Sequence, residues 1–166
     1  MLPDQPWLVK CQHCGALIWI DALEKVGEVD PFGKDDAKFR DVDSYDTPSI
    51  RDCFAVLKGG VSDTQKVRYL RRLVWWMGND ARRSGGDFLP LSDDEIANLR
   101  AFAALLDESD ENDRIVKAEA MRELGKYEEA MALLSRPFSA ELAQAADIIK
   151  SLTRKRDPFV REMKFE

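Results

Sequence analysis

The chain has 166 residues, of which 45% are hydrophobic and 34% charged, and it carries a formal net charge of -6. This size suits one ordinary domain with a small appendage, and the composition allows a packed interior. The negative charge disfavours nucleic acid and acidic membranes as general partners. We find neither an apolar run of roughly 20 residues nor a secretory signal, and three cysteines are few for a secreted scaffold. We therefore expect a soluble cytoplasmic protein that does not contact a membrane.

The first predicted element is a β-hairpin at the start of the chain. Residues 7–20 read WLVKCQHCGALIWI, with two β-prone apolar runs on either side of a Cys-Gln-His-Cys-Gly turn. Residues 28–45 are acidic and show no sustained periodicity, which indicates a loop or linker. We therefore predict an N-terminal knuckle hairpin with its linker in residues 1–46 and a helical domain in residues 47–166.

Helices are predicted through the rest of the chain. Thr47-Pro48 can cap the first of them, which would end near residues 59–60. A capping box of Ser62 and Gln65 opens the second, and Gly78 would end it. The expected core stripe of this second helix is Val67, Leu70, Val74 and Met77.

Later helix boundaries follow from the same kinds of signal. Ser92 and Glu95 form another capping box, residues 107–113 are an acidic run that indicates a solvated turn, and Gly125 separates two helices at a tight corner. A last short helix could start at residue 157. These six or seven helices predict a mainly α fold, an antiparallel helical array with a small N-terminal β-hairpin head.

Two resemblances add to this interpretation. Residues 117–134, KAEAMRELGKYEEAMALL, resemble a tetratricopeptide-type helix pair, with Tyr127 opening the second helix and Ala130 at the close approach. Only about one repeat is legible, whereas an array needs about three, so this resemblance implies local geometry alone. The combination of CxxCGxLIW, WWMGNDARR and AEAMRELGKYEEA is similar to uncharacterised bacterial proteins with a zinc-ribbon-like head on a helical body. That second resemblance implies no activity.

Cys11 and Cys14 are the candidate metal ligands, and zinc is the metal we expect there. The two-residue spacing lets both thiolates face one ion, and Gly15 tolerates the turn that follows. A closed zinc site needs four ligands, and the sequence has no second motif of this kind. Three completions stay open: Cys53 with a carboxylate or His13, a matching pair from a second copy in a homo-oligomer, or a metal-free turn. Cys53 also fits a small buried core position.

The second predicted helix carries a further non-polar surface opposite its core stripe. This surface is either covered by another layer or free to bind a partner protein or ligand. The polar cluster after it could stitch a corner between helices or form a pocket for an anion. The candidate partner-binding or ligand-binding residues are Tyr69, Arg72, Trp76, Asn79, Asp80, Arg82 and Arg83.

No catalytic residues are predicted, because the chain has one histidine and no nucleophile or dinucleotide motif. The leading hypothesis is a structural or interaction protein whose helical body docks a partner protein through Trp76 and Arg72. One alternative is a zinc-knuckle module that contacts nucleic acid with the basic residues in 150–161. The other is an enzyme that acts on an anionic small molecule through the arginine cluster.

Overall fold

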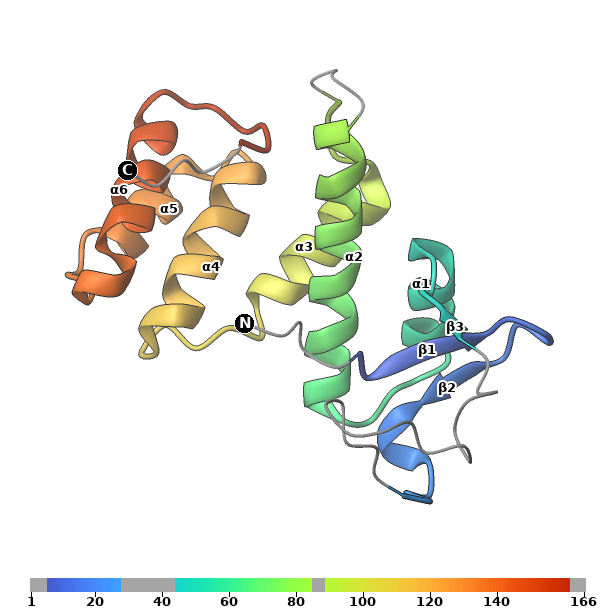
Figure 1. Cartoon of the computed structure of the whole chain (residues 1–166). Helices are drawn as coiled ribbons and strands as arrows, with labels where there is room; N and C mark the ends of the chain where they lie inside the picture. The colour runs from blue at the N-terminus through green and yellow to red at the C-terminus, as the bar shows by residue number, and fades with distance from the viewer. Residues whose placement is uncertain (1–5, 28–43, 85–88, 162–166) are drawn as a thin grey trace, which may run out of the picture. The chain divides into compact units, whose positions relative to one another are not determined.

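A computed structural model of the chain describes residues 6–27, 44–84 and 89–161 (Figure 1). Helices predominate, and three short strands lie near the N-terminus. The chain forms two compact units, Met1–Gly59 and Gly60–Glu166, so the first helix groups with the strands. The boundary between the units lies later than the predicted division at residues 46 and 47. Of the helices in the described residues, none is long and apolar enough to cross a membrane.

The first unit contains a three-stranded antiparallel sheet. The central strand β1 (Leu8–Cys11) pairs with β2 (Leu17–Trp19) on one side and with β3 (Tyr45–Asp46) on the other. The predicted hairpin is therefore confirmed, and a short 3-10 turn, Ile20–Ala22, follows it. Strand β3 was not predicted, because two residues are too few to show an alternating pattern. Most of the predicted linker lies outside the described residues.

Helix α1 (Ile50–Lys58) completes the first unit. Its N-terminus is a reciprocal capping box, in which Ser49 Oγ accepts from the Asp52 amide at 3.2 Å and Asp52 Oδ2 accepts from the Ser49 amide at 2.9 Å. The cap is therefore Ser49 and not Thr47. Asp52 also forms an ion pair with Lys10 of β1 at 3.0 Å, which ties the helix to the sheet.

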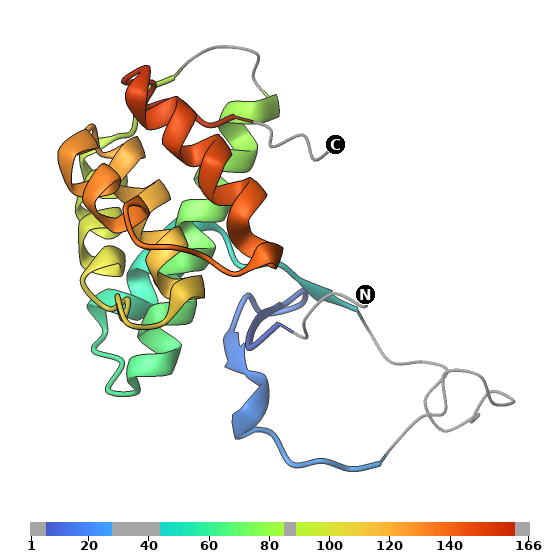
Figure 2. The same cartoon turned by 90° about the vertical axis from the view of Figure 1, so that its left-hand side faces the viewer.

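The second unit consists of helices only. They are α2 (Thr64–Ser84), α3 (Asp93–Ala103), α4 (Glu111–Glu123), α5 (Tyr127–Leu134) and α6 (Ala140–Arg154). Each helix packs against the next, and α6 also packs against α4. Helices α4, α5 and α6 therefore form a group of three mutually contacting helices (Figure 2).

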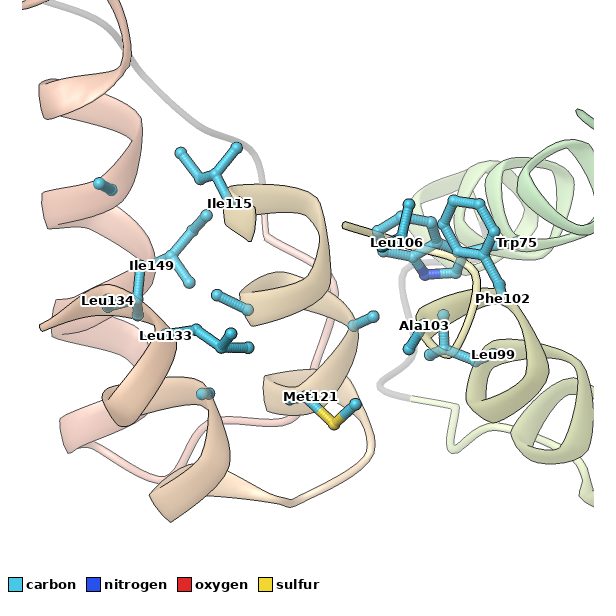
Figure 3. Close-up of a cluster of buried hydrophobic side chains, with 14 residues drawn as sticks. Trp75, Leu99, Phe102, Ala103, Leu106, Ile115, Met121, Leu133, Leu134 and Ile149 are labelled. Atoms are coloured by element: carbon cyan, nitrogen blue, oxygen red, sulfur yellow. The ribbon is translucent and has the colours of Figure 1, made fainter. Parts of the chain in front are cut away.

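All five helices of this unit contribute to one hydrophobic core (Figure 3). Trp75 of α2 contacts Phe102 of α3, with the ring centroids 5.8 Å apart and the planes tilted by 45°. Ala118 and Ala130 have no exposed surface, which allows α4 and α5 to approach closely. The core residues are Trp75, Leu99, Phe102, Ala103, Leu106, Ile115, Ala118, Ala120, Met121, Ala130, Leu133, Leu134, Ala146 and Ile149.

Helix α2 differs from its prediction at both ends. It continues through Gly78 to Ser84. A Cβ at Gly78 would overlap the Glu95 carboxylate, so this glycine provides room for a neighbouring side chain and does not end the helix. At the N-terminus, the side chain of Asp63, and not that of Ser62, accepts a hydrogen bond, from the Gln65 amide at 2.8 Å.

The other helix boundaries show which local sequence signals predict a helix end correctly. The Ser92–Glu95 capping box is confirmed. The corner before α5 is also confirmed: Gly125 has a φ of 73°, and the Lys126 amide donates to the Met121 carbonyl at 2.8 Å. The acidic run 107–113 is only partly a turn, because α4 begins inside it. The last predicted helix is wrong for residues 157–161, which are not helical.

Candidate functional site

Three stripes run along α2, and each faces a different environment. The apolar stripe predicted as the core is inward, with Leu70 and Val74 fully buried and Val67 and Met77 half-buried. A second stripe makes the side-chain contacts to α3 and α4, and we call it the internal polar stripe. Its residues are Arg68, Arg71, Trp75, Asn79 and Arg82. They recur every three or four positions, so they share one face of the helix.

Ion pairs and hydrogen bonds hold the internal polar stripe against its neighbours. Arg68 Nη1 donates to Asp113 Oδ2 of α4 at 2.9 Å. Arg82 Nη2 donates to Glu95 Oε1 of α3 at 2.5 Å. Asn98 of α3 donates from Nδ2 to the Arg71 carbonyl at 2.9 Å. The contact between α2 and the next two helices therefore includes polar contacts in addition to the apolar contact between Trp75 and Phe102.

The buried carboxyl of Glu123 lies at the centre of this contact. Trp75 Nε1 donates to Glu123 Oε2 at 2.7 Å, and Asn79 Nδ2 donates to Oε1 at 3.1 Å. Burial raises the pKa of Glu123 to about 7, and the negative charge of Glu119 adds to the rise. The two donors and the Arg122 guanidinium favour the ionised form and offset only part of this effect.

Arg122 is fully buried and secures the segment that follows α6. Its guanidinium forms two hydrogen bonds with the Glu119 carboxylate, at 2.8 Å from Nε and 2.5 Å from Nη2. Nη1 donates to the backbone carbonyls of Asp157 and Phe159. This network places residues 158–160 beside the end of α4.

A pocket of about 300 Å³ opens next to these residues. Its wall comes from the ends of α2 and α4, from residues 89–91, from α3 and from residues 158–160. Most of the lining side chains are apolar, and the charged ones are Arg82, Arg100 and Glu123. Arg100 and Glu123 were not predicted as site residues, because nothing in the local sequence marks either as part of a cavity.

The third stripe of α2 contains the other predicted partner-binding residues, and we call it the outward stripe: Tyr69, Arg72, Trp76, Asp80 and Arg83. The Trp76 side chain is 49% exposed, and the Arg72 guanidinium lies 4.7 Å from its ring centroid. Asp80 and Arg83 form an exposed ion pair, and Tyr69 is half-buried. Of the seven predicted residues, Asn79 and Arg82 lie instead on the internal polar stripe.

Cys11 and Cys14 occupy the turn between β1 and β2. The Gly15 amide donates to the Cys11 carbonyl at 2.9 Å, and Gly15 has a φ of 70°. The Cys14 side chain is exposed, and that of Cys11 is half-buried. Hydrogen bonds from the backbone of Cys14 and His13 lower the pKa of the Cys11 thiol. Within the described ranges, no three His, Cys, Asp or Glu side chains are grouped to bind a metal.

Two further predicted features also have defined surroundings. Cys53 has no exposed surface, and burial raises the pKa of its thiol to about 11, as suits a small core residue. Near the C-terminus, Arg156 pairs with Glu128 and Arg161 pairs with Asp157. Part of the basic charge in residues 150–161 is therefore neutralised within the chain.

No family model matches this chain, and no curated protein or solved structure is significantly similar to it. The resemblances to a tetratricopeptide-type helix pair and to proteins with a zinc-ribbon-like head therefore stay predictions.

Proposed function

We propose that the helical unit is an interaction module that docks an acidic segment of a partner protein on the outward stripe of α2. The observation that carries this proposal is the half-exposed ring of Trp76 with the Arg72 guanidinium beside it. Tryptophan, tyrosine and arginine are the residues most enriched at the energetic centres of protein interfaces. Such a ring offers a large apolar contact area and loses little conformational freedom on binding.

The charge of the outward stripe supports an acidic partner. Arg72 and Arg83 carry two positive charges and Asp80 one negative charge, so the stripe is basic on a chain whose net charge is -6. No carboxylate among the described residues forms an ion pair with Arg72. A guanidinium that lies on an aromatic ring can bind a carboxylate with two hydrogen bonds while the ring packs against an apolar neighbour.

The rest of the unit supports the rigidity that such a surface needs. The internal polar stripe anchors α2 to two other helices, so the helix that carries the outward stripe is fixed in place before a partner arrives. We propose that the corner between α4 and α5 belongs to the same scaffold, as a single tetratricopeptide-like helix pair. It would act as support for α2 and not as a peptide groove.

A panel of synthetic peptides tests the docking proposal. Acidic peptides that alternate Asp or Glu with Leu or Phe should bind the full chain, and peptides with Lys in the acidic positions should not. Trp76→Ala and Arg72→Ala should each weaken binding at least tenfold, which corresponds to about 1.4 kcal/mol. Trp7→Ala is the matched control, because Trp7 is 43% exposed and lies in the other unit. Equal binding by wild type and Trp76→Ala would refute the proposal.

A second candidate function concerns the knuckle, where two cysteines and a glycine with positive φ share one turn. We propose that two copies of the chain each supply Cys11 and Cys14 to one tetrahedral zinc ion. Metal analysis and mass measurement under reducing conditions should give one zinc for two chains in a dimer. Cys14→Ser should release the zinc and leave monomers, whereas Cys53→Ser should retain it. A monomer with a full complement of one zinc would contradict this assignment.

The remaining alternatives have weaker support. Nucleic-acid binding by the knuckle would need free basic residues near the C-terminus, and Arg156 and Arg161 are paired with carboxylates. A steep loss of binding to single-stranded oligonucleotides with added salt would favour that alternative over protein docking.

A further inference from the structure

The pocket beside Glu123 combines apolar walls with an unequal distribution of charge. The Arg82 side chain is 11% exposed and is paired with Glu95, so its positive charge is balanced by that carboxylate. Arg100 lines the same pocket and is exposed. No acidic side chain in the described part of the chain pairs with it. The lining of the pocket therefore includes one exposed guanidinium, that of Arg100, without an ion-pair partner among the described residues.

The acidic residue of the lining, Glu123, has its carboxyl group already engaged. Glu123 is only 6% exposed, and both of its carboxyl oxygens already accept hydrogen bonds from α2. A ligand anion would be repelled from this side whenever Glu123 is ionised. Elsewhere in the lining, side chains such as Ile96, Leu124 and Phe159 provide apolar contacts. An occupant therefore needs an apolar body and a negative group at one end.

The size of the pocket limits that occupant. Its volume of about 300 Å³ is at the lower end of the range for small-molecule sites. If each non-hydrogen atom takes about the 30 Å³ that a water molecule takes in the liquid, the pocket holds roughly ten of them. This volume is too small to bury a whole nucleotide or a long acyl chain, and it suits a short fatty or aromatic acid.

We infer that the pocket binds a small amphipathic carboxylate, whose apolar body lies against the walls and whose carboxylate binds the Arg100 guanidinium. The two nitrogen donors of a guanidinium match the two oxygens of a carboxylate, which gives the head group a defined position. The site lies on a different face of α2 from the outward stripe. Ligand binding in the pocket therefore does not require the docking proposal to be correct.

Octanoate is a suitable probe, with 1-octanol as its neutral counterpart and octyl phosphate as an alternative anion. Two-dimensional NMR of the full chain should show octanoate moving the indole signal of Trp75, which hydrogen-bonds the lining residue Glu123. The indole signals of Trp7 and Trp19, in the other unit, should stay in place. Octanoate that moves no indole signal, or that moves those of Trp7 and Trp19 instead, would overturn the inference.

Variants separate the head-group contact from the apolar contact. Arg100→Gln should raise the dissociation constant of octanoate at least fivefold and leave that of 1-octanol unchanged. Arg154→Gln removes an exposed arginine of α6 and should change neither. Ile96→Trp should fill the pocket and abolish binding of both probes.

Two outcomes would reject the assignment even if a probe binds. Equal octanoate affinity in wild type and Arg100→Gln would show that the carboxylate does not bind this guanidinium. Binding of octyl phosphate that depends on Arg100, together with no binding of octanoate, would show that the head group is not a carboxylate.

Discussion

The two compact units of this protein are stabilised in different ways. Among the described residues of the first unit, the buried hydrophobic side chains are Leu8, Val9 and Cys53, and several large apolar side chains are exposed. In the second unit, 14 buried side chains form one cluster, 13 of them from the five helices and Leu106 from the turn after α3 (Figure 3). Partly buried ion pairs join α2 to α3 and to α4. The second unit therefore has a core of ordinary size, whereas the first has a very small one.

This difference suggests where each unit obtains its stability. A small unit with little buried apolar area usually depends on a metal, a cross-link or association with another chain. Zinc shared by two knuckles would supply such a stabilising contact for the first unit. The helical unit needs no such contribution, and it can instead tolerate a half-exposed tryptophan and a pocket on its surface.

The largest effect that we predict is a difference in stability loss when a phenylalanine is removed from the helical unit or from the first unit. Phe102 is 1% exposed in the helical cluster, whereas Phe54 of α1 is only half-buried. Phe102→Ala should lower the free energy of unfolding by about 3–5 kcal/mol, because it removes an aromatic side chain from a packed interior. Phe54→Ala should cost clearly less. Urea unfolding followed by circular dichroism measures both, and a larger loss for Phe54→Ala would contradict the comparison.

The next effect concerns the pH dependence of the helical unit. Because the pKa of Glu123 is about 7 in the folded chain and ordinarily 4.5, the folded state holds an extra proton between these values. The free energy of unfolding should therefore fall as the pH rises through this window, by up to about 3 kcal/mol in total. Two charged groups of α4, Glu119 and Arg122, act on Glu123. From α2, Arg82 donates a hydrogen bond to Asn79, which in turn donates to Glu123.

Two variants test whether Glu123 is the group that makes the free energy of unfolding depend on pH. Urea titrations at several pH values should show that Glu123→Gln loses the dependence. Glu128→Gln, which alters an exposed glutamate of α5, should keep it. A stability that is constant or rises across the window in the wild type would show that the buried carboxyl titrates at its ordinary value.

The smallest predicted effect compares two equivalent helix caps, one in each unit. Ser49 caps α1 and Ser92 caps α3, each through a reciprocal box with an acidic residue three positions later. Replacing either serine with alanine should cost about 1 kcal/mol. Hydrogen exchange should quicken in the first turn of the altered helix only, and Ser151→Ala, within α6, should quicken neither. Faster exchange in both helices after one substitution would mean that each cap stabilises more than its own helix.

The features that could be predicted from sequence are those fixed by neighbouring residues. The hairpin around the cysteines, the Ser92 cap and the corner at Gly125 each depend on a few consecutive positions. The internal polar stripe was missed because its partners are distant in sequence. Arg68 and Asp113 are 45 residues apart, and Trp75 and Glu123 are 48 apart.

The same limit explains why the candidate site was only partly predicted. A search for apolar periodicity along α2 finds one inward stripe, and it cannot show that polar side chains form a second. Asn79 and Arg82 were therefore included among the candidate binding residues, and the contacts that they make agree with the alternative that this polar cluster joins neighbouring helices. Gly78 was read as a helix end because its role, making room for the Glu95 side chain, depends on another helix. The pocket requires five separate segments and leaves no motif in the sequence.

The adjacent tryptophans of α2 test the central claim most directly, because they belong to different stripes. The Trp75 side chain is 8% exposed and its indole N–H donates to a buried carboxylate, whereas Trp76 is 49% exposed. After transfer to deuterated water, the indole signal of Trp75 should persist long after that of Trp76 has disappeared. Equally fast loss of both signals, or slower loss at Trp76, would contradict the division of α2 into an internal polar stripe and an outward stripe.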